Sequence, residues 1–114
     1  MRAIIGVVAV VSLLGSACGS STSPANSCGS SGASANVNTT SSNSFSPNTA
    51  TITHGQSVCW QNSSSAAHTV TDNGGAFDTS LPVAQIFVHT YATAGTYPYH
   101  CKIHAGMTGT ITVN

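Results

Sequence analysis

Residues 95–113 read GTYPYHCKIHAGMTGTITV, and this stretch decides the fold. Two runs rich in aromatic and β-branched residues, which favour strands, flank a short loop. The loop holds Cys101, His104 and Met107 within seven residues. A thiolate, an imidazole and a thioether are therefore expected close together, between two strands.

The preceding residues repeat this pattern of short alternating segments separated by turns. Val58 and Trp60 share one face of a β-prone run and leave Cys59 on the other, and residues 87–91 alternate in the same way. No segment sustains the 3.6-residue period of an amphipathic helix. Six to eight short strands at this spacing predict an all-β fold, a sandwich of two antiparallel sheets.

The chain divides into three expected segments. Residues 1–17 have the positive start, apolar stretch and small final residues of a signal peptide, which predicts export to the periplasm or cell surface. Cys18 then becomes either a lipidated N-terminus, the one expected membrane contact, or an unmodified residue. Residues 18–35 have the Ser/Gly-rich composition of a flexible tether, and residues 36–114 form the folded domain.

Charge is nearly absent. The 114 residues include four charged side chains, Arg2, Asp72, Asp78 and Lys102, and the formal net charge is zero. Nucleic acid is excluded as a partner, because phosphate binding needs clustered Lys or Arg residues. With two carboxylates and no catalytic triad, the protein is not expected to be an enzyme.

The loop predicts a metal site. A blue-copper centre takes two imidazoles and one thiolate in a plane, with a weak axial thioether. Cys101, His104 and Met107 supply three of these ligands, and His68, in another β-prone run, is the candidate for the fourth. Zinc sites more often show paired Cys spacing, a binuclear copper loop needs a second Cys, and iron–sulfur clusters need more cysteines. We therefore expect one type 1 copper ion.

The remaining histidines are expected to lie outside the metal site. His54 falls at a turn. His89 is expected on the same strand face as Phe87 and Tyr91, which favours a position in the core or at the end of a sheet. His100 must point to the face opposite its neighbour Cys101, which favours the surface.

These stretches resemble the cupredoxins, the blue type 1 copper proteins, and the short loop is most similar to that of the amicyanin group. The resemblance extends over nearly all of residues 36–114. It rests on Phe45-Ser46-Pro47, Gly55-x-x-Val58-x-Trp60-x-Asn62, His68-Thr69-Val70, Phe77-Asp78, residues 95–101 and residues 107–113. It implies a Greek-key β-sandwich with copper at one end, and electrons that pass at the exposed edge of His104. His100 lies where plastocyanins have a second electron route, although a plain surface role is favoured.

The function implied is that of a monomeric one-electron carrier, cycling between Cu(I) and Cu(II) between an extracytoplasmic protein donor and acceptor. The alternatives are a copper-binding or delivery protein and a cupredoxin scaffold that no longer binds copper. Because charge is scarce, we expect partners to dock on a small apolar surface around His104. Its expected members are Ala105, Gly106, Met107, Leu81 and Pro82.

Two further contacts are expected. A backbone N–H directed at the Cys101 sulfur would stabilise the thiolate, and the amide of Thr69 is the candidate. Many cupredoxins have Asn at this position, so the contact of the Thr69 side chain is open. Cys59 pairs with Cys28 or stays free, because a sequence alone does not give connectivity.

Overall fold

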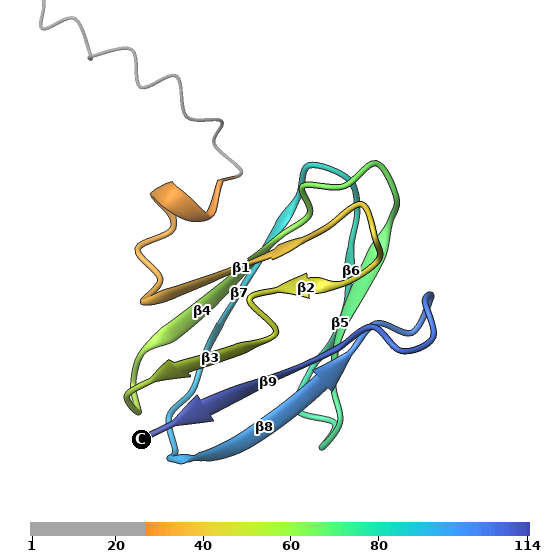
Figure 1. Ribbon diagram of the computed structural model, residues 1–114. Coiled ribbons are helices and arrows are strands. Elements are labelled where there is room, and N and C mark those ends of the chain that lie inside the picture. The colour runs from red at the N-terminus through yellow and green to blue at the C-terminus, as the bar shows by residue number, and fades with distance from the viewer. Residues whose placement is uncertain (1–26) are drawn as a thin grey trace, which may run out of the picture.

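Residues 27–114 are described by a computed structural model, and they form a sandwich of two β-sheets (Figure 1). The elements are η1 (Cys28–Ser30), a short 3-10 helix, and the strands β1 (Ala35–Thr39), β2 (Phe45–Ser46), β3 (Thr49–Ile52), β4 (Ser57–Gln61), β5 (His68–Asp72), β6 (Asp78–Leu81), β7 (Ile86–Thr90), β8 (Gly95–His100) and β9 (Thr108–Val113). Within this part of the chain, no helix has the length and apolar character needed to cross a bilayer. The predicted signal peptide and Cys18 lie outside the described residues.

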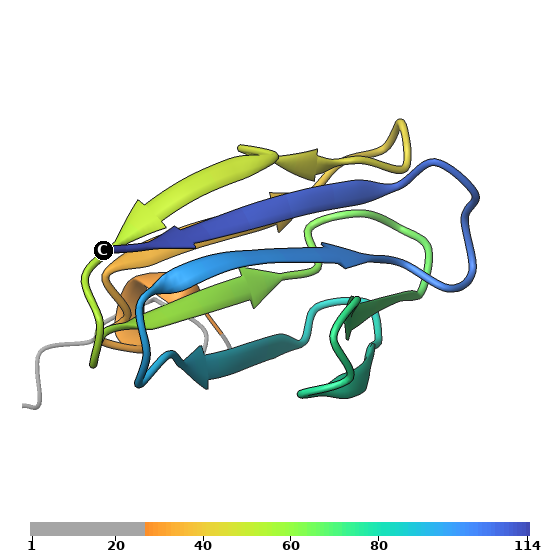
Figure 2. The same ribbon diagram turned by 90° about the horizontal axis from the view of Figure 1, so that it is seen from below.

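The two sheets have the strand orders β2-β1-β4-β7 and β3-β9-β8-β5-β6. β8 and β9 lie side by side, and the loop that joins them projects at the end of the sandwich opposite the C-terminus (Figures 1 and 2). The all-β sandwich predicted from the sequence is confirmed.

The pairing is more varied than predicted. β1 pairs with β4 and β3 pairs with β9 in parallel, so both sheets are mixed rather than antiparallel throughout. Neither pair is joined by a hairpin, so no tight turn imposes an antiparallel direction on it. The described residues contain nine strands instead of six to eight, because the chain breaks at Pro47, which has no N–H for a ladder. β2 stays in one sheet and β3 joins the other.

The core is built from side chains of β4 and β8 that meet between the sheets. Val58 and Trp60 of β4 are fully buried between the sheets, and the ring of Tyr99 on β8 lies 5.3 Å from that of Trp60, centroid to centroid. Tyr99 pairs across the ladder with Gly109 of β9, and a Cβ at Gly109 would overlap the Tyr99 ring. Both strands that carry the metal loop are thereby anchored in the core.

The segment before β1 is fastened to the outer face of β4. Cys28 forms a disulfide with Cys59, and the Cys28 N–H donates to Oε1 of Gln61 at 3.0 Å. Cys59 is fully buried although it points away from the core, because η1 covers it. The Cys28–Cys59 pairing is confirmed. Residues 27–35, which were expected to belong to the tether, are part of the described structure.

Candidate metal centre

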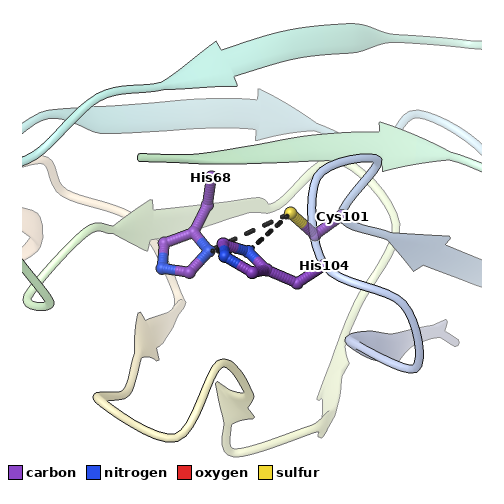
Figure 3. Close-up of side chains that lie close together, drawn as sticks. All are labelled: His68, Cys101 and His104. Atoms are coloured by element: carbon purple, nitrogen blue, oxygen red, sulfur yellow. Dashed lines mark hydrogen bonds between the residues drawn. The ribbon is translucent and has the colours of Figure 1, made fainter. Parts of the chain in front are cut away.

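Three of the four predicted ligands converge at the loop end of the sandwich. His68 begins β5, Cys101 directly follows β8, and His104 lies in the loop that leads to β9. Figure 3 shows the two imidazole rings and the thiol turned toward one another. Their donor atoms all lie within 4.8 Å of one another.

The triangle of donor atoms has the size that a single metal ion requires. Nδ1 of His68 lies 3.1 Å from Nδ1 of His104, and the Cys101 Sγ lies 3.9 Å and 3.7 Å from these two nitrogens. The point equidistant from the three atoms in their plane lies about 2.1 Å from each, which is close to metal–nitrogen and metal–sulfur bond lengths. The three donor atoms are therefore spaced to bind one ion.

The donor set selects copper. Two imidazoles and one thiolate in a trigonal plane, with a thioether nearby, match a blue-copper centre. Met107 is 1% exposed, and its C=O accepts from the Cys101 N–H at 2.9 Å. The Met107 N–H donates to the C=O of His104 at 3.3 Å, so the loop closes on itself. The residues present fit one copper ion, with Met107 as the fourth predicted ligand.

Thr69 fixes the cysteine ligand to β5. Its N–H donates to the Cys101 Sγ at 3.3 Å, in a buried position, which confirms the contact predicted from the sequence. Its hydroxyl accepts from the Lys102 N–H at 2.8 Å. The side-chain contact left open above is therefore made by the Thr69 hydroxyl. Thr69 thus binds both the sulfur of Cys101 and the backbone of the next residue, Lys102.

His68 is oriented by a partly buried hydrogen-bond chain that was not predicted from the sequence. Its Nε2 lies 2.8 Å from Oγ of Ser64, and Ser64 Oγ lies 2.8 Å from Oδ1 of Asn62. When the His68 Nε2–H donates to Ser64, Nδ1 keeps its lone pair for a metal. Asn62 is 2% exposed and also accepts from the Thr39 hydroxyl. The available signal was an Asn–Ser run directly after a buried strand, a pattern typical of side-chain-to-backbone turns.

The two imidazoles differ in their surroundings. His68 is 1% exposed, whereas His104 is partly exposed. Burial lowers the pKa of His68, and the neighbouring His104 lowers it further. A neutral imidazole is the form that binds metal, so the protein favours the binding form of His68 at neutral pH.

Comparisons with known proteins agree with this geometry. Residues 7–113 match the cupredoxin-like domain family. This chain belongs to the cupredoxins. A purple cupredoxin from Nitrosopumilus maritimus is 26% identical, with a TM-score of 0.65, and the match covers 70% of this chain and 99% of that one. A reduced amicyanin variant is 26% identical with a TM-score of 0.63, covering 73% and 83% of the two chains. The Cu(I) form of another amicyanin variant is 28% identical with a TM-score of 0.62, covering 73% and 83%.

The apolar surface of this cupredoxin differs from the one expected. Met107 and Leu81 are 1% and 0% exposed, so both belong to the core and neither can form a docking surface. Ile103, directly before His104, is 56% exposed and was missed. We define the His104 face by its exposed or partly exposed members. They are Ile103, His104, Ala105 and Gly106, which follow one another in the loop. Pro82, which was also expected on this surface, is exposed and follows Leu81, which pairs with His68.

The other three histidines lie outside the donor triangle. His54 is exposed, and its Nδ1 lies 3.0 Å from the C=O of Asn114. Nδ1 of His100 lies 2.6 Å from Oδ1 of Asn73, near the surface. His89 lies among aromatic rings, as predicted from its alternation with Phe87 and Tyr91 along the strand.

We expect replacement of Ser64 to weaken metal binding without unfolding the protein. Ser64→Ala removes the hydroxyl that accepts from His68, so copper affinity should fall about 10- to 100-fold, as for other groups that orient a ligand. Chelator competition measures the affinity. Ser65→Ala is the matched control, because Ser65 is exposed and its hydroxyl has no hydrogen bond in the described part of the chain. Equal losses in the two variants would contradict this role.

His89 should make stability depend on pH. Its ring lies 4.5 Å from that of Phe77 and 4.7 Å from that of Tyr91; burial lowers its pKa, and Asp72 partly opposes this. The unfolded chain therefore takes up a proton first, near pH 6.5, and stability falls as the pH drops below that value. His89→Phe should reduce the loss of Tm between pH 7.5 and pH 5. The two proteins are compared in the same metal state, and equal pH slopes would contradict the assignment.

Proposed function

We propose that this cupredoxin is a one-electron carrier whose copper ligands are His68, Cys101, His104 and Met107. The observation that carries the proposal is the donor triangle of His68, Cys101 and His104, which is buried except at the edge of His104. Bound copper would supply the one-electron change between Cu(I) and Cu(II). The protein supplies a fixed set of donors and one exposed imidazole through which an electron can enter and leave.

Fixed donors suit electron transfer. Cys101 is held by the Thr69 N–H, and His68 is held by Ser64. These bonds would hold both donors in place when the charge of the ion changes, so little rearrangement is needed. A copper-delivery protein requires the opposite, ligands that exchange readily. Here Cys101 is 5% exposed and His68 is 1% exposed, which favours retention over delivery.

Location outside the cytoplasm is part of the proposal. The Cys28–Cys59 disulfide supports an oxidising compartment, since such bonds seldom persist in the cytosol. The signal-like residues 1–17 and Cys18 support export and a lipid anchor in the periplasm or at the cell surface. Mass spectrometry of the mature N-terminus tests the anchor, and an unmodified Cys18 would overturn it.

The function is tested by whether the visible absorption of the copper-loaded protein changes reversibly with the oxidation state of the copper. The protein reconstituted with Cu(II) should show the intense visible absorption of a copper–thiolate bond. Ascorbate should bleach this absorption, and an oxidant should restore it without loss of copper. A colourless protein would contradict the ligand set. Rapid transfer of the reduced ion to a Cu(I) chelator would favour delivery instead.

We further propose that redox partners dock on the His104 face. Among residues 27–114 the charged side chains are Asp72, Asp78 and Lys102, so docking depends on apolar contact and should vary little with salt.

Electron self-exchange, in which two copies meet through their copper ends, reports on the His104 face without a known partner. Ile103→Lys places a like charge at the centre of both surfaces. It should slow self-exchange about tenfold, equivalent to about 1.4 kcal/mol of repulsion. Line broadening in NMR spectra of mixed Cu(I) and Cu(II) protein measures the rate. Val88→Lys is the control, because Val88 is 40% exposed on β7 and is not a member of the His104 face. Equal slowing in both variants would contradict docking at this face.

A further inference from the structure

Two of the three charged side chains among residues 27–114 meet beside the cysteine ligand. Nζ of Lys102, the residue after Cys101, lies 2.6 Å from Oδ2 of Asp78, and the two side chains are 51% and 52% exposed. Exposed ion pairs add little to stability. In a domain that otherwise relies on neutral polar groups, the location of this pair is therefore more informative than its strength.

A second connection joins the same two residues through the side chains of Thr69 and Thr71 on β5. The Lys102 N–H donates to Oγ1 of Thr69 at 2.8 Å, Oγ1 of Thr69 lies 3.1 Å from Oγ1 of Thr71, and the Thr71 hydroxyl donates to Oδ1 of Asp78 at 3.0 Å. Because Thr71 donates to Asp78, the Thr69 hydroxyl must donate to Thr71. The bonds form a closed ring, which we call the Asp78 relay.

The Asp78 relay reaches the thiolate through Thr69. The N–H of Thr69 donates to the Cys101 Sγ, and the hydroxyl of the same residue is a member of the relay. Thr69 and Thr71 are each 8% exposed, the bond between their hydroxyls is buried, and the carboxylate that accepts from Thr71 strengthens the chain of bonds. The bonds from Lys102 and Thr71 lower the pKa of Asp78, which keeps that carboxylate ionised.

We propose that Asp78 is a positioning residue for the Cys101 thiolate: through Thr71, Thr69 and Lys102 it holds the Thr69 N–H against Sγ. The inference rests on the proposed copper function. An N–H bonded to the sulfur withdraws electron density and stabilises Cu(I) relative to Cu(II). An intact relay therefore raises the reduction potential, and a broken relay lowers it.

Thr71→Val is the decisive variant, because it breaks the relay and leaves every charge in place. Asp78→Asn would give a result that is harder to interpret. It breaks the relay, which lowers the potential, but it also leaves the Lys102 ammonium unpaired, and that positive charge favours Cu(I). Thr71→Ser keeps the hydroxyl and should rescue the relay. Thr112→Val on β9 is the matched control, because its hydroxyl has no hydrogen bond in the described part of the chain.

Two measurements separate positioning from a structural role. Relative to the parent, Thr71→Val should shift the Cu(I)/Cu(II) equilibrium toward Cu(II) by about threefold to tenfold, where tenfold is 59 mV for one electron. In the metal-free protein, NMR should show faster hydrogen exchange at the amides of Thr69 and Lys102. Thr71→Ser and Thr112→Val should match the parent in both measurements.

The outcomes are distinguishable. A lower Tm in Thr71→Val with an unchanged potential and unchanged amide exchange would overturn the positioning role. A parent protein that shows no copper–thiolate absorption would instead overturn the proposed function. The exchange measurement on metal-free protein would still report whether Thr71 holds Thr69 and Lys102 in place.

Discussion

Cys101→Ser should abolish the visible absorption of the copper-loaded protein completely. The absorption requires a thiolate bonded to Cu(II), and Cys101 is the free cysteine among residues 27–114. A serine hydroxyl stays protonated at neutral pH and is a hard donor, so it replaces neither the charge nor the softness of the sulfur. We expect copper affinity to fall by roughly 100-fold or more, beyond the effect of losing a group that only orients a ligand.

The fold of Cys101→Ser should survive. Serine is close in size to cysteine, and the neighbouring Cys101 N–H to Met107 C=O bond is made by the backbone. Absorption spectra and chelator competition measure the loss, and thermal unfolding of the metal-free protein checks the fold. Removal of the two disulfide cysteines is the matched comparison, because that change should leave the colour intact. A coloured Cys101→Ser protein would show that sulfur from another residue binds the ion.

The metal centre could be predicted from the sequence because its chemistry is local. Cys101, His104 and Met107 share one loop, and the rare combination of their donor types limits the candidate ions. The fourth predicted ligand, His68, is distant in the sequence, so predicting it required an assumption about which strand lies beside that loop. The pairing of β5 with β8 places it there.

The groups that orient the ligands could not be predicted in the same way. Ser64 and the members of the Asp78 relay are common polar residues whose sequence neighbours say nothing of a metal. Thr71 meets Asp78 because β5 and β6 pair in a particular register, with Thr71 opposite Asp78. Such contacts depend on long-range pairing, which alternation along a single strand does not specify.

The exposure of side chains in loops was also hard to predict from the sequence. Alternation predicts which side chains share a face, but loop residues have no such periodicity. Met107 and Leu81 were expected at the surface and lie in the core, whereas Ile103 is exposed. In a loop that must bring its donors inward, the thioether is buried and the apolar residue beside His104 is left outside. The His104 face is therefore apolar as predicted, but Ile103 rather than Met107 or Leu81 supplies its large apolar side chain.

Removal of the Cys28–Cys59 disulfide should lower the free energy of unfolding by about 3–4 kcal/mol. The two cysteines are 31 residues apart in the sequence, and opening a loop of this length restores chain entropy to the unfolded state. The double variant Cys28→Ala/Cys59→Ala avoids a new free thiol. Denaturant titration of the metal-free protein measures the change, since bound metal would add its own stabilisation.

The same variant should keep the colour and the reduction potential of the parent. The disulfide lies on the outer face of β4, whereas the donor triangle lies at the loop end between the sheets, and no hydrogen bond of the Asp78 relay involves either cysteine. Gln61→Ala is a useful control, because it removes the acceptor of the Cys28 N–H and keeps the disulfide, so it should cost much less stability. A large change in potential in the double variant would contradict this separation. It would mean that the attachment of η1 to β4 is coupled through the sandwich to the metal ligands. The segment before β1 would then help to determine the reduction potential.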